Sequence, residues 1–261
     1  MKIAAQENLV PGNSFLEKVE NLAAFGYDGV ELSGNNLAGR VQEVKSALKN
    51  SSIKPAAICG GFSFNFLSQK QDEREQSKKE FKDLLAAAAE VGSQGVIIVP
   101  IFGQPQLPDM TPWKTAVELE EELWIEQLRE LTEYAGQQGS QIILEPLNRY
   151  ETHYLKTLAH AVQLCEKVQS KHMTILGDFF HMNIEEANIA NSFKEAAKWL
   201  GYVHLADSNR VVPGLGHTNF KEGFAALQEI GYTGFMSLEC GVPGDRAQTL
   251  KQSVKFLKSQ L

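Results

Sequence analysis

The sequence predicts an α/β fold in which eight parallel strands close into a (β/α)8 barrel. Short apolar runs alternate with longer helical stretches eight times along the 261 residues. Strands and helices that alternate in this way form parallel sheets with right-handed crossovers, and eight such units can close into a barrel. No linker, charge run or low-complexity segment divides the chain, so we expect residues 1–261 to form one domain.

The expected strands are short and rich in aliphatic residues. They cover residues 2–6, 28–33, 53–59, 95–99, 142–145, 173–178, 202–206 and 234–239. The expected helices cover residues 14–25, 38–50, 72–91, 118–138, 157–169, 184–198, 219–230 and 245–260. If the barrel closes, the first and last strands are neighbours.

The composition excludes several classes of function. A net charge of −7 argues against a nucleic-acid partner, which requires a basic surface. Cys59, Cys165 and Cys240 are widely spaced and form no CxxC pair, so we expect free thiols in a reducing compartment. The chain runs directly from Met1 into a strand, and no apolar run approaches the roughly 20 residues of a membrane span. We therefore expect a cytoplasmic protein with no membrane partner.

Four polar residues end the last four expected strands. The apolar run at residues 142–144 stops at Glu145, and Pro146 next to it ends the strand. Asp178 and Glu239 end two later strands, and His204 lies near the end of the strand between them. The carboxyl ends of barrel strands carry the active sites of such folds. We therefore expect these four side chains to meet at one mouth of the barrel.

A cation is needed to hold such a group together. Three carboxylates that converge disfavour each other's charged forms unless a positive charge lies between them. An oxygen-rich set with one nitrogen suits Mn²⁺ best, with Co²⁺, Mg²⁺ or Zn²⁺ as alternatives. Any one of the four residues alone could be structural, and His204 alone could be a hydrogen-bonded core histidine. Their common register along successive strands predicts a divalent metal site.

Three segments resemble a known family. Residues 144–148 (LEPLN), 177–186 (GDFFHMNIEE) and 203–210 (VHLADSNR) are similar to the xylose-isomerase-like TIM-barrel sugar isomerases and epimerases. Among these, the segments most resemble the ketose 3-epimerases of the D-tagatose and D-psicose type. The likeness covers the whole strand–helix pattern, with its specific motifs in residues 142–241.

The resemblance implies roles for named residues. It implies that the metal ligands are Glu145, Asp178, His204 and Glu239. It also implies that Glu145 and Glu239 are the catalytic acid–base pair. Residues implied to contact the substrate are Glu151, His181 and Arg210 near the reacting carbonyl and Trp113 as an apolar wall over the mouth.

The implied reaction requires a base, an electrophile for the developing enediolate and an acid. A divalent metal supplies the electrophile. Glu145 and Glu239 on opposite faces of the substrate would take and return the proton with inversion, and His181 and Arg210 would donate hydrogen bonds to the oxyanion. The alternatives are that His181 with Asn183 shapes the start of the next helix and that Arg210 is a solvated loop residue.

The amino-terminal half carries less information about function. Glu31 ends the second strand, and we expect it to pair with a surface cation in preference to touching a distal hydroxyl. Trp113 could pack under its own loop instead of covering the mouth. Phe62, Phe64 and Phe66 are expected to form a loop core or a subunit contact.

The expected function is a metal-dependent ketose 3-epimerase that transfers protons between two bases through a cis-enediolate. Its partner is a small-molecule sugar, and assembly into a homodimer or a homotetramer stays open. An aldose–ketose isomerase or hydroxypyruvate isomerase would use the same site, and a non-catalytic sugar-binding barrel is a further alternative. An apurinic-site endonuclease is disfavoured, because that resemblance requires histidines after the third and fourth strands, where the chain has residues 59–61 (CGG) and 99–101 (VPI).

Overall fold

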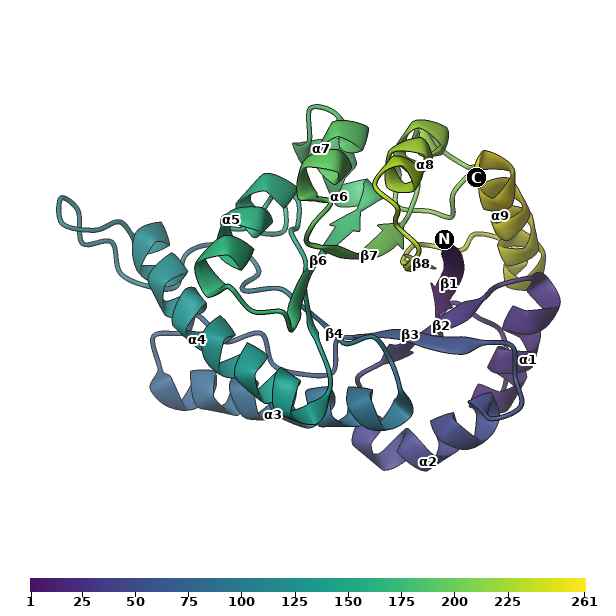
Figure 1. Ribbon diagram of the computed structural model, residues 1–261, viewed down its shortest axis with the longest axis horizontal. Helices are drawn as coiled ribbons and strands as arrows, with labels where there is room; N and C mark the ends of the chain where they lie inside the picture. Colours follow the sequence, from purple (N-terminus) through teal and green to yellow (C-terminus); the bar gives the residue numbers. More distant parts are fainter.

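The computed structural model describes residues 1–261 as a closed barrel of eight parallel strands (Figure 1). Each strand pairs with the next along the chain, and β1 (Lys2–Gln6) pairs with β8 (Phe235–Leu238) to close the barrel. The predicted fold class and the predicted closing pair are therefore confirmed. The other strands are β2 (Gly29–Ser33), β3 (Lys54–Cys59), β4 (Val96–Ile98), β5 (Ile142–Leu144), β6 (Met173–Asp178) and β7 (Leu200–Leu205).

Helices surround the barrel on its outer face, and the two chain ends lie near each other beside β1 and α9 (Figure 1). None of the helices is both long and apolar enough to span a membrane. The helices are α1 (Phe15–Phe25), α2 (Leu37–Leu48), α3 (Gln71–Val91), α4 (Ala116–Gln138), α5 (Leu158–Val168), α6 (Phe179–Glu185), α7 (Ile189–Ala196), α8 (Phe220–Glu229) and α9 (Arg246–Gln260).

The single helix expected at residues 184–198 is wrong, because α6 and α7 replace it. Asp178 ends β6 and at once caps α6, since its side chain accepts a hydrogen bond from the Phe180 N–H at 2.8 Å. Asn188 caps α7 in the same way through the Asn191 N–H. His181 therefore lies in the first turn of α6, three residues after its cap Asp178, and does not begin a later helix.

Successive side chains along each strand point alternately into the barrel and out towards the helices. Tyr202 on β7 belongs to a small apolar cluster inside the barrel, whereas Val203 packs outwards in the large core under the helices. Side chains point to alternate faces of a strand, so His204 returns to the inside above Tyr202. The same offset places Glu145 two positions after the interior Ile143. An apolar floor thus lies beneath the polar residues at the carboxyl mouth.

Two loops at this mouth pack backbone against backbone. A Cβ atom at Gly61 would lie 2.2 Å from the carbonyl carbon of Gly34, and one at Gly34 would lie 2.0 Å from the carbonyl oxygen of Gly60. Gly60 and Gly61 also adopt positive φ angles of 69° and 88°. Only glycine fits such contacts, which fixes the paths of the loops after β2 and β3.

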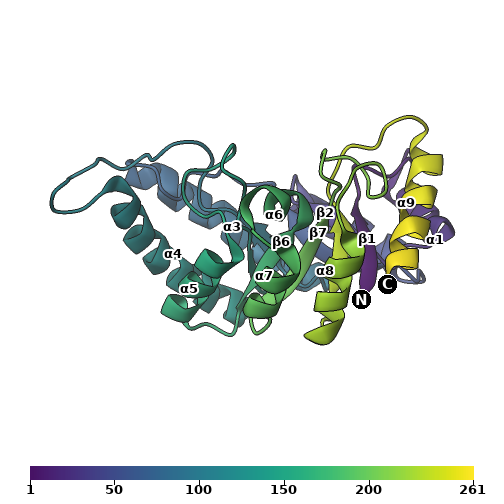
Figure 2. The same ribbon diagram turned by 90° about the horizontal axis from the view of Figure 1, so that it is seen from above.

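The connection between β4 and α4 forms an arm that projects from the barrel (Figures 1 and 2). Figure 2 shows this arm on the side of the loops that follow the strands, with both chain ends at the opposite edge. The buried Glu120 carboxylate anchors the base of the arm, because it accepts a hydrogen bond from the Gln106 N–H and contacts His153 Nε2 at 2.6 Å. The arm is thus fixed at its base and exposed at its tip.

Candidate active site

Polar side chains from the ends of β5 to β8 converge in one buried group. One ligand-type atom from each of Glu145, Asp178, His204 and Glu239 lies within 4.8 Å of the others. Strand pairing explains their common height, because Asp178 is opposite His204 and the Glu239 N–H bonds to the carbonyl oxygen of Leu205. The structure therefore brings together the four residues expected to bind a metal.

His204 lies at the centre of this group. Its Nδ1 atom is 3.4 Å from Glu145 Oε1 and 3.1 Å from Glu239 Oε2. On the other side of the ring, Nε2 lies 2.9 Å from Oε2 of the buried Glu31. Carboxylates that bond to the far nitrogen of a histidine fix the orientation and tautomer of metal-ligating imidazoles. The contact leaves Nδ1 directed at the two glutamates.

The expectation that Glu31 pairs with a surface cation is wrong. Glu31 is 1% exposed, and it accepts hydrogen bonds from the Tyr202 hydroxyl and from Gln6 Nε2, both at 2.8 Å. Gln6 Nε2 also donates to Glu239 Oε1 at 2.9 Å. The buried Glu31 and the partly buried Gln6 thus form a polar layer that supports His204 and Glu239 from the side of β1 and β2.

The residues of the group fit a divalent cation. Glu145 Oε1 and His204 Nδ1 are both buried and make no hydrogen bond within the chain. Buried polar atoms in proteins nearly always have a partner, so two such atoms facing each other indicate a ligand between them. Carboxylate oxygens with one imidazole nitrogen are a suitable donor set for Mn²⁺, Mg²⁺, Co²⁺ or Zn²⁺.

Burial and the neighbouring charges shift the pKa values of the residues in this group. Burial raises the pKa of Glu145. Burial acts in the same direction on Glu239, but His204 and Arg210 outweigh it and hold the pKa of that carboxyl well below its usual range. Burial lowers the pKa of His204, and the carboxylates of Glu31 and Glu239 raise it well above its ordinary value. These shifts favour the charged forms of His204 and Glu239 and disfavour the charged form of Glu145.

Arg210 reaches the group from the loop after β7. Its Nη1 donates to Asp178 Oδ2 at 2.6 Å and its Nη2 donates to Glu239 Oε2, while the guanidinium lies 4.6 Å from the Phe180 ring centroid. The backbone of Arg210 has a positive φ of 59°, which is uncommon outside glycine. The alternative of a solvated loop residue is thereby removed, since the guanidinium is bonded inside the site.

His181 presents one defined nitrogen to the same group. The Asn148 N–H lies 3.2 Å from His181 Nδ1, so Nδ1 acts as the acceptor and Nε2 carries the proton. That Nε2 is 3.5 Å from Asp178 Oδ2 and 4.0 Å from Glu145 Oε1. Asn148 also donates to Glu151 Oε1 at 2.8 Å, so it connects two of the expected substrate contacts.

A cavity of about 120 Å³ opens above these residues. Its polar wall includes both glutamates and the expected contacts Glu151, His181 and Arg210. Its apolar wall includes Phe64 and Phe102, whose ring centroids are 5.0 Å apart. We call this space the catalytic cavity; its lining residues are Cys59, Gly60, Phe64, Ile97, Val99, Phe102, Glu145, Leu147, Glu151, His181, Arg210 and Glu239.

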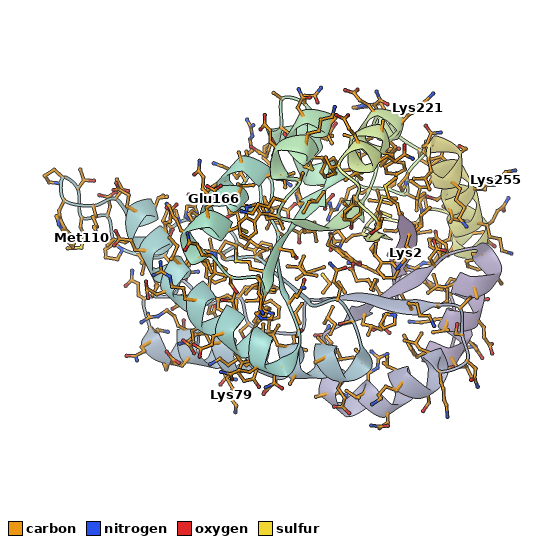
Figure 3. The ribbon with its side chains drawn as sticks, viewed as in Figure 1. Lys2, Lys79, Met110, Glu166, Lys221 and Lys255 are labelled. Atoms are coloured by element: carbon orange, nitrogen blue, oxygen red, sulfur yellow. The ribbon has the colours of Figure 1, made fainter.

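Trp113 does not line the catalytic cavity. Its side chain is 67% exposed near the tip of the arm, and Figure 3 shows the neighbouring Met110 at the end of the arm, away from the barrel. Trp113 is not packed under its own loop either. The aromatic wall expected from Trp113 is supplied by Phe64 and Phe102, and a role of Trp113 in substrate binding stays a prediction.

Sequence reasoning missed Gln6, Asn148 and the two phenylalanines as site residues. Gln6 ends the first strand as Glu145 ends the fifth, so the same strand-end argument could have found it. Asn148 lies three residues after Glu145, at the end of the 144–148 motif, which was a usable signal. The phenylalanines lie in long loops, whose paths no periodic pattern specifies.

Comparison with known proteins places this geometry in a family. A family model described as a xylose isomerase-like TIM barrel matches residues 19–260. The chain belongs to this family. The 3-dehydro-D-guloside 4-epimerase of Escherichia coli is 33% identical over 262 residues, which cover 99% of this chain and 100% of that protein. The D-psicose 3-epimerase of Ruminiclostridium cellulolyticum is 28% identical over 231 residues, which cover 85% of this chain and 76% of that protein.

Solved structures of the family agree with this assignment. The apo 3-keto-D-glucoside 4-epimerase of E. coli superposes with a TM-score of 0.91 at 33% identity, over 99% of each chain. The D-psicose 3-epimerase of Clostridium cellulolyticum with D-tagatose superposes with a TM-score of 0.87 at 24% identity, over 100% of this chain and 99% of that chain, which shows the shared fold. These relatives are epimerases, which confirms the expectation of an enzyme of the isomerase class.

Proposed function

We propose that the chain is a divalent-metal-dependent sugar epimerase that inverts a hydroxyl-bearing carbon next to a ketone. The observation that carries the proposal is the buried group at the barrel mouth, where Glu145 and Glu239 come from different strands and both face His204 Nδ1. A base and an acid on separate strands are what inversion requires, because the proton must leave and return on different faces.

Glu145, Asp178, His204 and Glu239 would hold the cation, with Mn²⁺ as our choice and Co²⁺, Mg²⁺ or Zn²⁺ as alternatives. When bound, a divalent cation polarises the ketone and lowers the cost of negative charge on its oxygen. Glu31 orients His204 for this role through its 2.9 Å contact with Nε2.

The remaining chemistry belongs to side chains of the chain itself. One of Glu145 and Glu239 removes the proton from the carbon next to the ketone, and the other delivers a proton to the opposite face. The protonated Nε2 of His181 and the guanidinium of Arg210 line the catalytic cavity and are donors for the developing oxyanion. Phe64 and Phe102 form the apolar side of this cavity.

Two substrate classes present such a carbon. The relative that matches over its whole length is named for a 3-dehydro sugar inverted at C4, and the D-psicose 3-epimerases are named for a ketose inverted at C3. In both, the inverted carbon is next to a ketone, so the same two glutamates serve. The full-length similarity favours the 3-keto sugar, and ketose 3-epimerisation is the second candidate.

The test is a substrate panel with Mn²⁺ in which NMR identifies the carbon that changes configuration. The panel contains methyl 3-keto-glucopyranoside, D-psicose, D-tagatose and hydroxypyruvate, and the Glu145→Gln variant is the control. We expect inversion next to the ketone by the wild type and none by the variant. An aldose product would instead mark an aldose–ketose isomerase, and the absence of any turnover with metal would contradict the proposal.

A further inference from the structure

A second cavity of about 260 Å³ adjoins the catalytic cavity at the barrel mouth, between the loops after β1 and β2. Cys59 and Glu239 line both cavities, so the two spaces meet at one of the proposed catalytic glutamates. We call the second space the polar chamber; its lining residues are Gln6, Glu7, Asn8, Glu31, Leu32, Ser33, Asn35, Cys59 and Glu239.

Size indicates that the two cavities serve one ligand. Small-molecule sites in proteins usually measure about 300–1,000 Å³. Neither cavity reaches this range alone, at about 120 Å³ and about 260 Å³, but the two together do. A substrate whose reacting carbon lies beside Glu239 in the catalytic cavity would therefore extend into the polar chamber.

The walls of the chamber are held in place before any ligand binds. Glu7 is 5% exposed and forms a paired contact with Arg40, whose Nη1 and Nη2 donate to its two oxygens at 3.0 and 2.8 Å. The same carboxylate accepts a hydrogen bond from the Ser33 N–H at 2.8 Å. On the opposite wall, Gln6 is fixed by its bonds to Glu31 and Glu239. Preorganised polar walls reduce the entropy cost of binding.

Two side chains of the chamber remain available to a ligand. Asn8 and Asn35 are exposed, and only their backbone atoms make hydrogen bonds, the Asn8 carbonyl with Arg246 and the Asn35 N–H with Ser33. Each side-chain amide offers both donors and an acceptor, which matches the hydroxyl groups of a sugar.

The charge of the chamber restricts what it can bind. Its carboxylates are those of Glu7, Glu31 and Glu239, and no lysine, arginine or histidine lines it. Phosphate and carboxylate groups bind to Arg, Lys or clustered N–H donors, and like charges repel them. The chamber therefore fits an uncharged group rich in hydroxyls.

We propose that the polar chamber binds a second, uncharged sugar unit of the substrate, so that the enzyme acts on a keto glycoside rather than on a sugar phosphate. This inference rests on the proposed function, because it assumes that the reacting carbon lies between Glu145 and Glu239. It adds Asn8 and Asn35 as residues that determine specificity at a distance from the proton transfer.

The experiment compares a 3-keto-glucosyl disaccharide, methyl 3-keto-glucopyranoside and D-tagatose 6-phosphate. Turnover is followed as deuterium uptake from D₂O next to the ketone, in the wild type and in the double variant Asn8→Ala/Asn35→Ala. We expect the double variant to raise KM for the disaccharide about tenfold, which corresponds to the loss of one or two hydrogen bonds. Its KM for the methyl glycoside and its kcat should stay within about twofold of the wild type. Asn50→Ala, an exposed change after α2, is the matched control.

The outcomes separate the two proposals. Equal KM values for the disaccharide in wild type and double variant, or a preference for the sugar phosphate, would overturn the chamber assignment while leaving the epimerase intact. Deuterium uptake from none of the three substrates, with metal present and the protein folded, would overturn the proposed function and the chamber with it.

Discussion

His204 is bounded by carboxylates at both ring nitrogens, and the partner at each nitrogen has a different task. Glu31 bonds to Nε2 from a fully buried position, while Glu145 and Glu239 face Nδ1. A residue that bonds to the far nitrogen of a metal-ligating histidine affects metal affinity by orienting the ring. Loss of such a partner typically lowers metal affinity about 10- to 100-fold.

We therefore predict that Glu31→Gln weakens Mn²⁺ binding about 10- to 100-fold, because the amide no longer stabilises the histidine in one tautomer. Isothermal titration calorimetry on the metal-free protein measures this directly. Glu20→Gln, an exposed change on α1, should bind Mn²⁺ like the wild type. Unchanged affinity in a correctly folded Glu31→Gln variant would show that this contact does not position the histidine.

The two glutamates should each be indispensable for turnover. Glu145→Gln and Glu239→Gln keep the side-chain size but remove a proton acceptor, and a general acid–base group typically supplies about 10²- to 10⁴-fold in rate. We expect kcat to fall by at least about 10²-fold in each variant, since metal binding suffers as well. A variant that retains wild-type kcat would exclude its glutamate from proton transfer.

Asp207 organises the loop that carries Arg210 after β7. Its carboxylate accepts hydrogen bonds from the N–H groups of Ser208, Gly214 and Thr218, at 2.8, 2.9 and 3.0 Å. Burial raises the pKa of Asp207, but these N–H groups outweigh it and hold the pKa below its ordinary value. The stabilisation is therefore present above the unfolded-state pKa of about 3.9 and is lost as the pH falls through the folded-state value.

We predict that Asp207→Asn lowers the free energy of unfolding at pH 7 by about 2 kcal/mol, because an amide cannot accept all three bonds. The difference from wild type should shrink below about pH 4, where the wild-type carboxyl also loses its charge. Urea denaturation at both pH values measures it, with the exposed Asp83→Asn as control. A difference that grows towards low pH would contradict the sign of this account.

At the level of elements, strands were more predictable than the segments that follow them. The run at residues 142–144 is buried on both faces, so its apolar sequence marks both its position and its end at Glu145. The break between α6 and α7 was not predictable from helical periodicity, because it depends on Asp178 serving as strand end and helix cap at once. The arm bearing Trp113 has no period, and its path depends on the tertiary contact between Glu120 and His153.

The acidic residues of the candidate site were predictable from the sequence, and the residues that support them were less so. Strand-end carboxylates at the spacing of one βα unit identify the group at β5 to β8, because parallel strands bring their carboxyl ends to one mouth. Gln6 and Glu31 obey the same geometry, but their task depends on partners at the ends of other strands, which are Glu239 for Gln6 and His204 for Glu31. Which side chains meet inside the barrel depends on how the barrel closes, and no local sequence pattern specifies it.

The four proposed metal ligands come from the ends of four strands, so metal binding should stabilise the closed barrel. At a hundredfold excess of free metal over Kd, a ligand that binds only the folded state adds about 2.7 kcal/mol. We predict a Tm increase of several degrees when Mn²⁺ is added to the chelated protein, and no increase in Glu145→Gln. Equal shifts in both proteins would place the cation elsewhere. The cytoplasmic location and assembly as a homodimer or homotetramer stay predictions.

The central claim is that two glutamates take and return a proton next to a ketone, and the fate of the hydrogen tests it most directly. The reaction is run in D₂O with Mn²⁺ and methyl 3-keto-glucopyranoside, and NMR locates the deuterium in the product. We predict one deuterium at the inverted carbon for the wild type, and a loss of inverted product of at least about 10²-fold in Glu145→Gln and in Glu239→Gln. Inverted product that retains the original hydrogen would contradict the two-glutamate mechanism.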